Sequence, residues 1–434
     1  MTNHGTTYDT TYDTTYDIVL FGATGFVGAL TAEYLAGHAP QDLRIALAGR
    51  NRAKLEDTRR NLAASHPRAE RFGLVIADSS DAESLRALAG SARVVISTVG
   101  PYFRYGLPLV EACAKAGTHY VDLSGEVLFM RESIRLYHDA AKNSGARIVH
   151  ACGFDSVPSD MGMLLLHQLA QQVGEPLESA TMIVRMKGGV SGGTVDSMRE
   201  QFKVTKADKE LARAVARPYT LSPDPESEPD VGKQEDFGII RTDSVGGRAD
   251  GWAGPFVMAG ANTRVVRRSN ALLSHAYGPQ LTYSEYMATG TGLKGRARSY
   301  ALAGGLGVAM VALNAPKLRG VLSRWVPEPG EGPSVEDRDN GFFSTTHYGT
   351  TAGGTMLSAT MSLDADPGYK GTSLMLGEAA LTLAVDTEDL PHECAADHQG
   401  PTGGGVLTPA TGLGLAYARR LAEAGMRMSP LPWQ

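Results

Sequence analysis

Cysteine is scarce in this chain of 434 residues, which has three in all: Cys113, Cys152 and Cys394. They lie far apart and show no spacing typical of a metal site, so we expect reduced thiols in a cytosolic protein and no bound metal. No serine-triad or cysteine-nucleophile pattern is present either, which argues against a hydrolase.

Long apolar runs and export signals are also lacking. The first residues do not combine a basic start with an apolar core, as a secretory signal would. No apolar run reaches the roughly 18 residues that span a bilayer, so a cytoplasmic location is expected. The most apolar run, residues 300–315, is either a buried or subunit-contact helix, in a possible homodimer, or a peripheral contact with the membrane surface.

Clustered positive charge is the third absence. The formal net charge is −6, and the basic residues are scattered along the chain, so no nucleic-acid partner is expected. With 42% hydrophobic and 20% charged residues, the composition is that of an ordinary globular protein, and the length suffices for two domains.

What organises the chain is an apolar run at residues 18–21 that ends in three glycines spaced three apart. The run is too short for a helix and predicts a strand, and the segment after it predicts a helix. Gly22 would permit a tight turn, Gly25 a close approach to a pyrophosphate, and Gly28 close packing of helix on strand. We therefore expect a dinucleotide-binding loop. It comprises Gly22, Ala23, Thr24, Gly25, Phe26 and Gly28.

A second apolar run, residues 44–48, leads to Arg50 at the position where a ribose-binding residue is expected. A carboxylate there would bind the 2′-hydroxyl of NAD, whereas Arg50, with Arg52 and Lys54 nearby, supplies positive charge for a 2′-phosphate. The sequence therefore predicts NADPH as cofactor, with Arg50, Asn51 and Arg52 at its ribose end. The alternative is a glycine turn of another α/β protein followed by a surface arginine.

Further apolar runs alternate with helical patterns as far as about residue 152, which predicts a Rossmann-type, doubly wound parallel sheet. Ligands bind at the carboxyl ends of such strands. Asp78, after the third strand, could contact adenine or cap the next helix. The turns after the fourth and fifth strands are expected to border the nicotinamide. Their residues are Ser97, Thr98, Val99, Gly100, Pro101 and Ser124.

The second half favours longer, alternating strands, among them a hairpin of residues 342–348 with 357–363. They predict an α+β domain with a largely antiparallel sheet and helices on one face, including residues 263–274 and 370–385. The acidic, proline-rich stretch 223–236 is expected to be mobile. The expected units are a disordered tail (1–15), an NADP-binding domain (16–155), a substrate and dimerisation domain (156–395) and a C-terminal segment packing on the NADP-binding domain (396–434).

The combination of motifs along the chain resembles the saccharopine dehydrogenase-like oxidoreductases, and specifically the actinobacterial trans-acting enoyl reductase branch. The resemblance runs from about residue 16 to the C-terminus. The motifs that carry it are residues 17–25, 48–50, 98–102, 105–106, 120–126, 153–160, 191–194, 262–270, 317–334 and 405–410.

The resemblance implies a two-domain NADP-dependent oxidoreductase whose last helix returns to the nucleotide domain. Some members of this branch reduce a carbon–carbon double bond in a chain held by a synthase without its own enoyl reductase. The implied substrate is a long acyl or polyketide thioester on a carrier or synthase, in lipid biosynthesis. Other relatives act on saccharopine or associate with lipid droplets, so an imine reductase and a non-catalytic, lipid-associated NADP-binding protein stay open as alternatives.

Reduction of an enoyl thioester needs a hydride, stabilisation of the enolate and a proton. Tyr102 and Tyr105, with Tyr120 behind them, are candidate proton donors because a neutral phenol can donate at physiological pH; packing residues are the alternative. Asp155 is a further catalytic candidate because it precedes a helix at the crevice. Asp160 is expected in the first turn of that helix, where the helix dipole stabilises its negative charge.

Three further groups carry polar or reactive atoms. Residues 191–194 would either hold a thioester carbonyl or cap a helix. His150 and Cys152 are expected to be a buried imidazole and an inert thiol. A set of arginines on one predicted helix would receive a phosphopantetheine arm or an acidic carrier protein, or form an exposed, solvated face. These are Arg264, Arg267 and Arg268.

Overall fold

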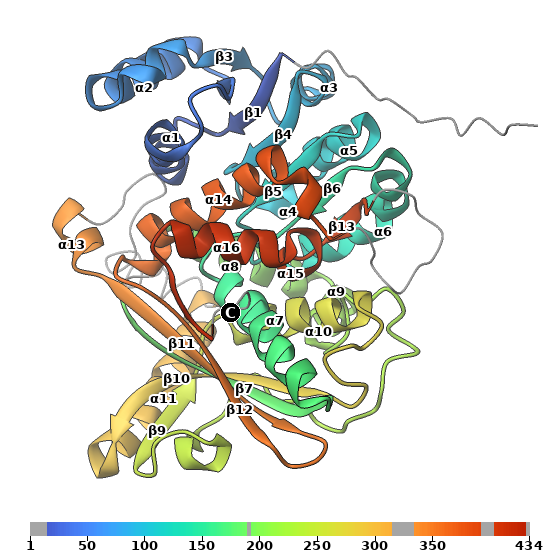
Figure 1. Cartoon of the computed structure of the whole chain (residues 1–434), viewed down its shortest axis with the longest axis vertical. Coiled ribbons are helices and arrows are strands. Elements are labelled where there is room, and N and C mark those ends of the chain that lie inside the picture. The colour runs from blue at the N-terminus through green and yellow to red at the C-terminus, as the bar shows by residue number, and fades with distance from the viewer. Residues whose placement is uncertain (1–14, 189–191, 315–333, 392–402, 431–434) are drawn as a thin grey trace, which may run out of the picture.

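The computed structural model describes residues 15–188, 192–314, 334–391 and 403–430. They form two seven-stranded sheets with helices around and between them (Figure 1). Residues 1–14 of the expected tail lie outside the described ranges.

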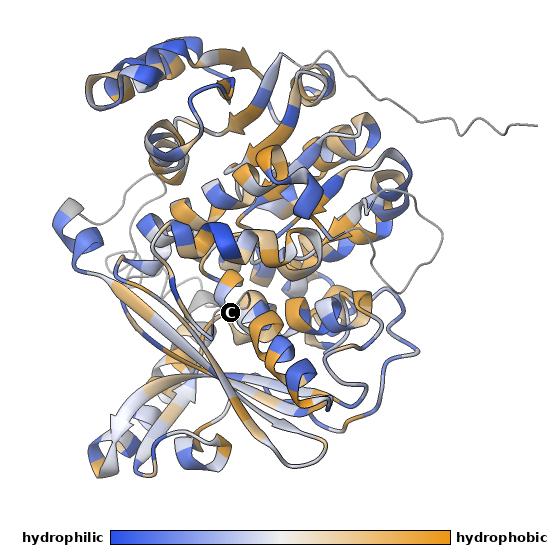
Figure 2. Ribbon diagram, viewed as in Figure 1, coloured by the Kyte–Doolittle hydropathy of each residue, from blue (hydrophilic) through white to orange (hydrophobic). Residues whose placement is uncertain are grey.

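Sheet A is the predicted doubly wound sheet, with all strands parallel in the order β3-β2-β1-β4-β5-β6-β13. Its central strands carry continuous apolar runs that are buried on both faces and stand out as orange segments in Figure 2, as expected for a sheet covered on both sides. The strands are β1 (Tyr16–Phe21), β2 (Ile45–Gly49), β3 (Gly73–Ile76), β4 (Ala92–Ser97), β5 (His119–Asp122), β6 (Arg147–Val149) and β13 (Gly405–Leu407).

Helices connect the strands of sheet A in sequence, which gives the strand–helix alternation that the sequence predicts. The C-terminal part of the chain completes the sheet, because β13 pairs with β6 in parallel. The helices are α1 (Phe26–His38), α2 (Arg52–Ser65), α3 (Ala82–Gly90), α4 (Tyr102–Tyr105), α5 (Leu107–Ala116) and α6 (Val127–Ser144).

Sheet B has the order β14-β12-β11-β7-β10-β9-β8, and every pairing except β7 with β10 is antiparallel. The predicted hairpin is confirmed as β11 and β12. Alternate residues of β11 are buried, because one face of the sheet packs on helices. The strands are β7 (Leu177–Lys187), β8 (Ile240–Arg241), β9 (Gly251–Pro255), β10 (Thr282–Thr291), β11 (Phe342–Thr351), β12 (Met356–Leu363) and β14 (Arg427–Ser429).

The helices of the second half lie between the two sheets or flank sheet B. α7 packs against β7, β11 and β12 and also contacts α10, α15 and α16. The helices are α7 (Val157–Val173), α8 (Gly192–Ala207), α9 (Lys209–Ala216), α10 (Ala259–Leu272), α11 (Gly292–Asn314), α13 (Val335–Asp339), α14 (Thr372–Val385), α15 (Pro409–Gly412) and α16 (Gly414–Glu423).

The helix α14 differs from the expectation that residues 370–385 cover the second sheet. It packs instead on sheet A, against β1, β4 and β5, with α1 and α16 beside it (Figure 1). Thirteen consecutive residues, 372–384, are buried, so the helix is buried all round and its periodicity could not show which sheet it covers. α16 returns the chain to sheet A through α14, as predicted.

Candidate functional site

The loop between β1 and α1 has the shape that its glycines predict. Gly22 has a φ of +92°, and a Cβ added there would lie 2.5 Å from Oγ1 of Thr98. A Cβ on Gly28 would lie 2.1 Å from the carbonyl oxygen of Gly22. No side chain caps the start of α1, and Thr24 and Gly25 are exposed. This cradle fits a pyrophosphate at a helix N-terminus.

The residues expected at the ribose end gather at the carboxyl ends of β2 and β3. Arg50, Asn51 and Arg52 are all exposed. Asn51 also caps α2, since its Oδ1 accepts from the Lys54 N–H at 3.0 Å. Hydrogen bonds from Ser80, together with the charge of Arg50, lower the pKa of Asp78. A cation and a carboxylate therefore face the same edge of the sheet.

Two further residues of the glycine loop were expected to contact the cofactor. Ala23 is buried and Phe26 is half-buried.

Asp78 does not cap the next helix. Its Oδ1 accepts from the Ser80 N–H at 2.9 Å and from the Ser80 hydroxyl at 2.7 Å, which closes a short turn. Asp81 provides the cap of α3 instead, accepting from the Glu83 N–H at 3.0 Å. Of the two expected roles for Asp78, the capping role is wrong.

The turn after β4 is hydrogen-bonded to the glycine loop. Thr98 Oγ1 lies 3.2 Å from the carbonyl oxygens of both Phe21 and Gly22, and Val99 packs close to Gly22. Ser97 is buried, and its carbonyl oxygen accepts from the Tyr102 hydroxyl at 3.0 Å. Thr98 thereby fixes the spacing of the two strand ends where a dinucleotide would lie. Pro101 forms the N-cap position of α4, and Gly100 precedes it through a cis peptide bond.

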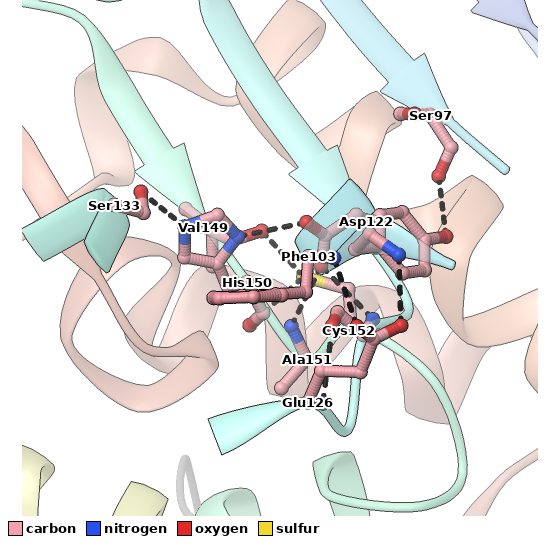
Figure 3. A network of polar contacts seen from close by, with 11 residues as sticks. Ser97, Phe103, Asp122, Glu126, Ser133, Val149, His150, Ala151 and Cys152 are labelled. Carbon is pink, nitrogen blue, oxygen red and sulfur yellow. Dashed lines mark hydrogen bonds and ion pairs between the residues drawn. The ribbon is translucent and has the colours of Figure 1, made fainter. Parts of the chain in front are cut away.

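Glu126, seen beside Phe103 in Figure 3, joins this turn to the second half of the chain through Ser197. One carboxylate oxygen accepts from the Tyr102 N–H at 2.8 Å and from the Ser197 hydroxyl at 2.6 Å, and the other accepts from the Phe103 N–H at 2.8 Å. Burial raises the pKa of Glu126. Ser124 supports it, because its Oγ accepts from the Glu126 N–H at 3.1 Å. Glu126 is a positioning residue that ties α8 to the strand-end turn.

A second polar network in Figure 3 lies behind this turn. His150 is 2.7 Å from Oδ2 of Asp122 on one side and 2.7 Å from the Ser133 hydroxyl on the other. These residue types are those of a hydrolytic triad, yet all three side chains are buried and none lines the cavity described in the next paragraph. The network therefore ties β5, β6 and α6 together. Burial raises the pKa of the Cys152 thiol well above its ordinary value, which agrees with the inert thiol that the sequence predicts.

A cavity of about 490 Å³ opens from the carboxyl ends of β4 and β5 into the second half of the chain. Its nucleotide-side wall includes Thr98, Gly100 and Ser124. Most of the remaining wall is apolar, which suits a nonpolar ligand. It is supplied chiefly by Leu123, Val127, Met198, Phe202, Val215, Phe237, Phe256, Met258, Leu306 and Ala309.

The catalytic candidates occupy different places. Asp155 and Tyr102 line the cavity, whereas Tyr105 is not part of its wall. The Tyr102 hydroxyl is hydrogen-bonded to the Ser97 carbonyl, as noted above, and burial raises the pKa of Tyr102 well above its ordinary value. Tyr105 stacks under the guanidinium of Arg104 at 5.0 Å. Tyr120 is fully buried in sheet A.

Asp160 lies in the first turn of α7, as expected, and is buried. Oδ2 accepts from the Ala410 N–H at 2.7 Å, and Oδ1 accepts from the Ser269 hydroxyl. Burial raises the pKa of Asp160 to about 6. The residue therefore joins α7, α10 and α15 and has a structural role.

The three arginines of α10 are buried, and only Arg264 of the three lines the cavity. All are at most 5% exposed, so the prediction of a solvated face is wrong. Arg268 donates to the carbonyls of Leu221 and Val406, both at 2.5 Å. Arg267 donates to Gln234 and to the Tyr283 carbonyl, and burial lowers its pKa to about 10.

Arg264 is the one of these arginines that lines the cavity. It forms an ion pair with Asp236 and donates to the Ala216 carbonyl at 3.2 Å. The stretch 223–236, expected to be mobile, is thus held by Arg264 and Arg267 through Asp236 and Gln234.

Sequence reasoning offered residues 191–194 as a candidate for the site but missed the rest of α8. Its cavity-facing residues recur at helical spacing, and these are Gly193, Ser197, Met198, Gln201 and Phe202. The amphipathic pattern of the segment predicts a helix, but nothing local shows that its inner face meets the cofactor edge of another sheet. Of the predicted motif 191–194, residue 191 and the side chain of residue 194 lie outside what the structure describes.

Two absences apply to the residues that the structure describes. They contain no group of three or more histidine, cysteine or acidic side chains arranged to hold a metal ion. Among their helices, none combines the length and apolarity needed to cross a membrane.

Comparison with known proteins agrees with this geometry. The sequence profile of the saccharopine dehydrogenase NADP-binding domain matches residues 18–149. A Mycobacterium tuberculosis protein provisionally named a trans-acting enoyl reductase is 46% identical, with 95% of this chain and 96% of that protein covered. The trans-acting enoyl reductase of Mycobacterium leprae is 43% identical, covering 94% and 96%.

Among solved structures, apo saccharopine dehydrogenase (L-Glu forming) from Saccharomyces cerevisiae superposes with a TM-score of 0.52 and 14% identity, over 95% of this chain and 99% of that one. At that identity the likeness shows a shared fold. The chain therefore belongs to the saccharopine dehydrogenase-like oxidoreductases, in the branch of the mycobacterial trans-acting enoyl reductases, and is an NADP-dependent oxidoreductase.

Proposed function

We propose that the chain is an NADPH-dependent enoyl reductase acting in trans on a long acyl or polyketide thioester. The observation that carries the proposal is the cavity, which begins at the strand ends beside the glycine loop and continues along a largely apolar wall to α11. The names of the mycobacterial relatives support the same reaction. Lipid biosynthesis is the setting that a long apolar acyl chain implies.

The cofactor would lie along the carboxyl edge of sheet A. The loop around Gly22, Gly25 and Gly28 would hold the pyrophosphate, and Arg50 and Arg52 the 2′-phosphate. Reduced nicotinamide supplies the hydride when bound. The turn that carries Thr98 and Gly100 would set the position of its ring, and Glu126 and Ser197 would hold that turn against α8.

The protein would contribute orientation and exclusion of water more than a strong acid. Tyr102 is a proton donor only if its hydroxyl leaves the Ser97 carbonyl, to which it donates now. Asp155 lines the cavity directly, so we favour it as the titratable side chain nearest the reacting chain. Tyr105 would act only after a movement of α4.

An imine reductase of the saccharopine type fits this cavity less well. Its substrates carry several carboxylates, which arginines would have to hold. Arg264 is the one basic residue among the described residues of the cavity wall, and Asp236 already neutralises it. Glu126 and Asp155 add negative charge. The wall therefore favours a neutral, apolar substrate.

The test is NADPH oxidation, followed by absorbance, with 2-enoyl thioesters of increasing chain length and saccharopine-pathway substrates in parallel. We expect oxidation that requires an enoyl thioester. Leu306→Asp, which places a charge in the cavity wall, should lower kcat/KM for long chains, whereas Val308→Asp, two residues along the same helix and 69% exposed, should not. NADPH binding without turnover of any thioester, carrier-bound ones included, would favour the non-catalytic alternative.

A peripheral membrane contact through residues 300–315 is proposed on the exposure of α11. Tyr300 and Val308 are 56% and 69% exposed, and basic side chains precede them on the same helix. Apolar and basic side chains together are typical of a helix that lies on an anionic bilayer. Co-sedimentation with anionic vesicles should fall for Val308→Asp and at high salt; a protein that never sediments would contradict this contact. The homodimer stays a prediction.

A further inference from the structure

Gln201 and Arg264 both line the cavity, and each keeps one buried hydrogen-bonding atom without a partner. Among the residues that the structure describes, Oε1 of Gln201 has no hydrogen-bond partner, and the same holds for Nε of Arg264. Both residues belong to the cavity wall. The Arg264 side chain is only 5% exposed. A buried polar atom without a partner is destabilising, so a built site that keeps two of them indicates a ligand that supplies the missing bonds.

The surroundings explain why the protein itself cannot satisfy these atoms. The two terminal nitrogens of Arg264 already donate, one to Asp236 and the Thr263 hydroxyl and the other to the Ala216 carbonyl. Nε is therefore the one guanidinium nitrogen without a partner among the described residues. Gln201 lies one helical turn from Ser197, whose hydroxyl is already bound to Glu126. The nearby wall residues Met198 and Phe202 have no donor for an amide oxygen.

The two atoms have opposite hydrogen-bonding character. The carboxamide oxygen of Gln201 accepts, and the Arg264 Nε–H donates. A ligand that meets both must therefore offer one donor and one acceptor, and an amide supplies both, with its N–H and C=O, on a neutral chain. A saturated or unsaturated acyl chain has neither group apart from its thioester carbonyl. The polar atoms thus point to the part of the substrate on the other side of the sulfur.

We propose that Gln201 and Arg264 bind the amides of the pantetheine arm to which the acyl chain is attached. The inference rests on the proposed function, because it takes the substrate to be a thioester. Because the arm has two amides, one amide can bind the Gln201 oxygen and the other the Arg264 Nε–H, so the two side chains need not be in contact. Coenzyme A and a carrier protein share this arm, and either source satisfies the geometry. Arg264 would bind through its Nε–H while Asp236 balances its charge.

The test compares thioesters of one enoyl chain that differ only in the thiol. The N-acetylcysteamine thioester retains one amide of the arm, and the ethyl thioester retains none. For the native enzyme we expect a kcat/KM ratio of about threefold to tenfold in favour of the amide, carried by KM, as one hydrogen bond would give. Gln201→Met, of similar volume, should bring the ratio toward one, and Arg264→Lys should lower it. The exposed Gln171→Met on α7 is the control.

A binding measurement makes the result independent of turnover. Calorimetric titration with the saturated thioesters should show the same preference for the amide, and its loss in Gln201→Met. Gln201→Met should also unfold at no lower temperature than the native protein, because it removes a buried oxygen that lacks a partner. Equal binding of the two thioesters by the native enzyme, or a ratio that Gln201→Met leaves intact, would overturn the assignment. Failure of every enoyl thioester to be reduced would instead refute the proposed function.

A last pair of substrates distinguishes the two sources of the arm, coenzyme A and a carrier protein. A lower KM for the carrier-loaded chain than for the coenzyme A thioester identifies a carrier protein, and the reverse identifies coenzyme A. Both outcomes retain the amide site, since both molecules present the same arm to Gln201.

Discussion

Glu285 is expected to hold a proton in the folded protein at pH values where it would be ionised in water. It lies on β10, is 1% exposed, and accepts from Asn262 at 2.9 Å, with the Tyr283 hydroxyl 2.9 Å from its other oxygen. Burial raises its pKa to about 7. Burial also lowers the pKa of His347 to about 3, so this imidazole, 3.3 Å from the Tyr283 hydroxyl, is a neutral acceptor.

These contacts form a consistent chain of donors. A protonated Glu285 can donate to the Tyr283 oxygen, and the Tyr283 hydroxyl can then donate to Nε2 of His347. When Glu285 is ionised, Tyr283 turns its hydrogen toward the carboxylate and His347 loses that donor. The neutral form of Glu285 therefore satisfies more of the buried polar atoms.

The sign of the pH dependence follows from the raised pKa. Between 4.5, the ordinary value, and about 7, the folded state holds a proton that the unfolded state has lost, so the free energy of unfolding falls as the pH rises through this window. The contribution is fully present below pH 4.5 and lost above about pH 7. A rise of this size in the pKa corresponds to a contribution of about 3 kcal/mol to the free energy of unfolding.

The assay is urea unfolding at several pH values from 5 to 8, extrapolated to water. Glu285→Gln, which stays neutral, should remove this part of the slope, so that native and variant stabilities converge at pH 5 and the variant becomes relatively more stable toward pH 8. The exposed Glu178→Gln on β7 is the control. A stability difference between native protein and Glu285→Gln that is constant from pH 5 to 8 would refute the reasoning, because Glu285 would then ionise alike in both states.

Other predictions concern the cofactor edge and the buried arginines. Gly28→Ala, whose Cβ would lie 2.1 Å from a carbonyl oxygen, should weaken NADPH binding at least tenfold in a fluorescence titration. Gly25→Ala leaves 3.4 Å to the nearest protein atom, so it should weaken NADPH binding through contact with the pyrophosphate and leave the free energy of unfolding nearly unchanged. Arg50→Ala should raise the Kd for NADPH about tenfold and leave that for NADH nearly unchanged, with Arg60→Ala as control; equal losses for both cofactors would contradict a 2′-phosphate contact. Arg268→Met should lower the free energy of unfolding by about 3 kcal/mol in urea, since two buried carbonyls lose their charged donor, and an unchanged midpoint would show that water replaces it.

The first half of the chain could be predicted from sequence because its signals are local. Gly22 allows the turn through its own φ of +92°, and Gly28 packs on the Gly22 carbonyl only a few residues away. Continuous apolar runs likewise indicate strands that are buried on both faces. Partners distant in sequence were not available to such reasoning. Arg268 resembles a surface arginine until Leu221 and Val406 are placed beside it. Because α14 is buried on every side, no pattern could assign it to sheet A.

The candidate site combines both kinds of residue. Thr98, Gly100 and Ser124 follow strands whose ends a parallel sheet must bring together, so the fold class predicts that they line one cavity at the expected cofactor edge. Ser197 and Gln201 reach the same cavity from α8, which the carboxylate of Glu126 ties to the strand-end turn through the Ser197 hydroxyl. One carboxylate thus links the part of the site that the sequence predicts to the part that would select the substrate, and substitution of Glu126 should change NADPH affinity and thioester KM together.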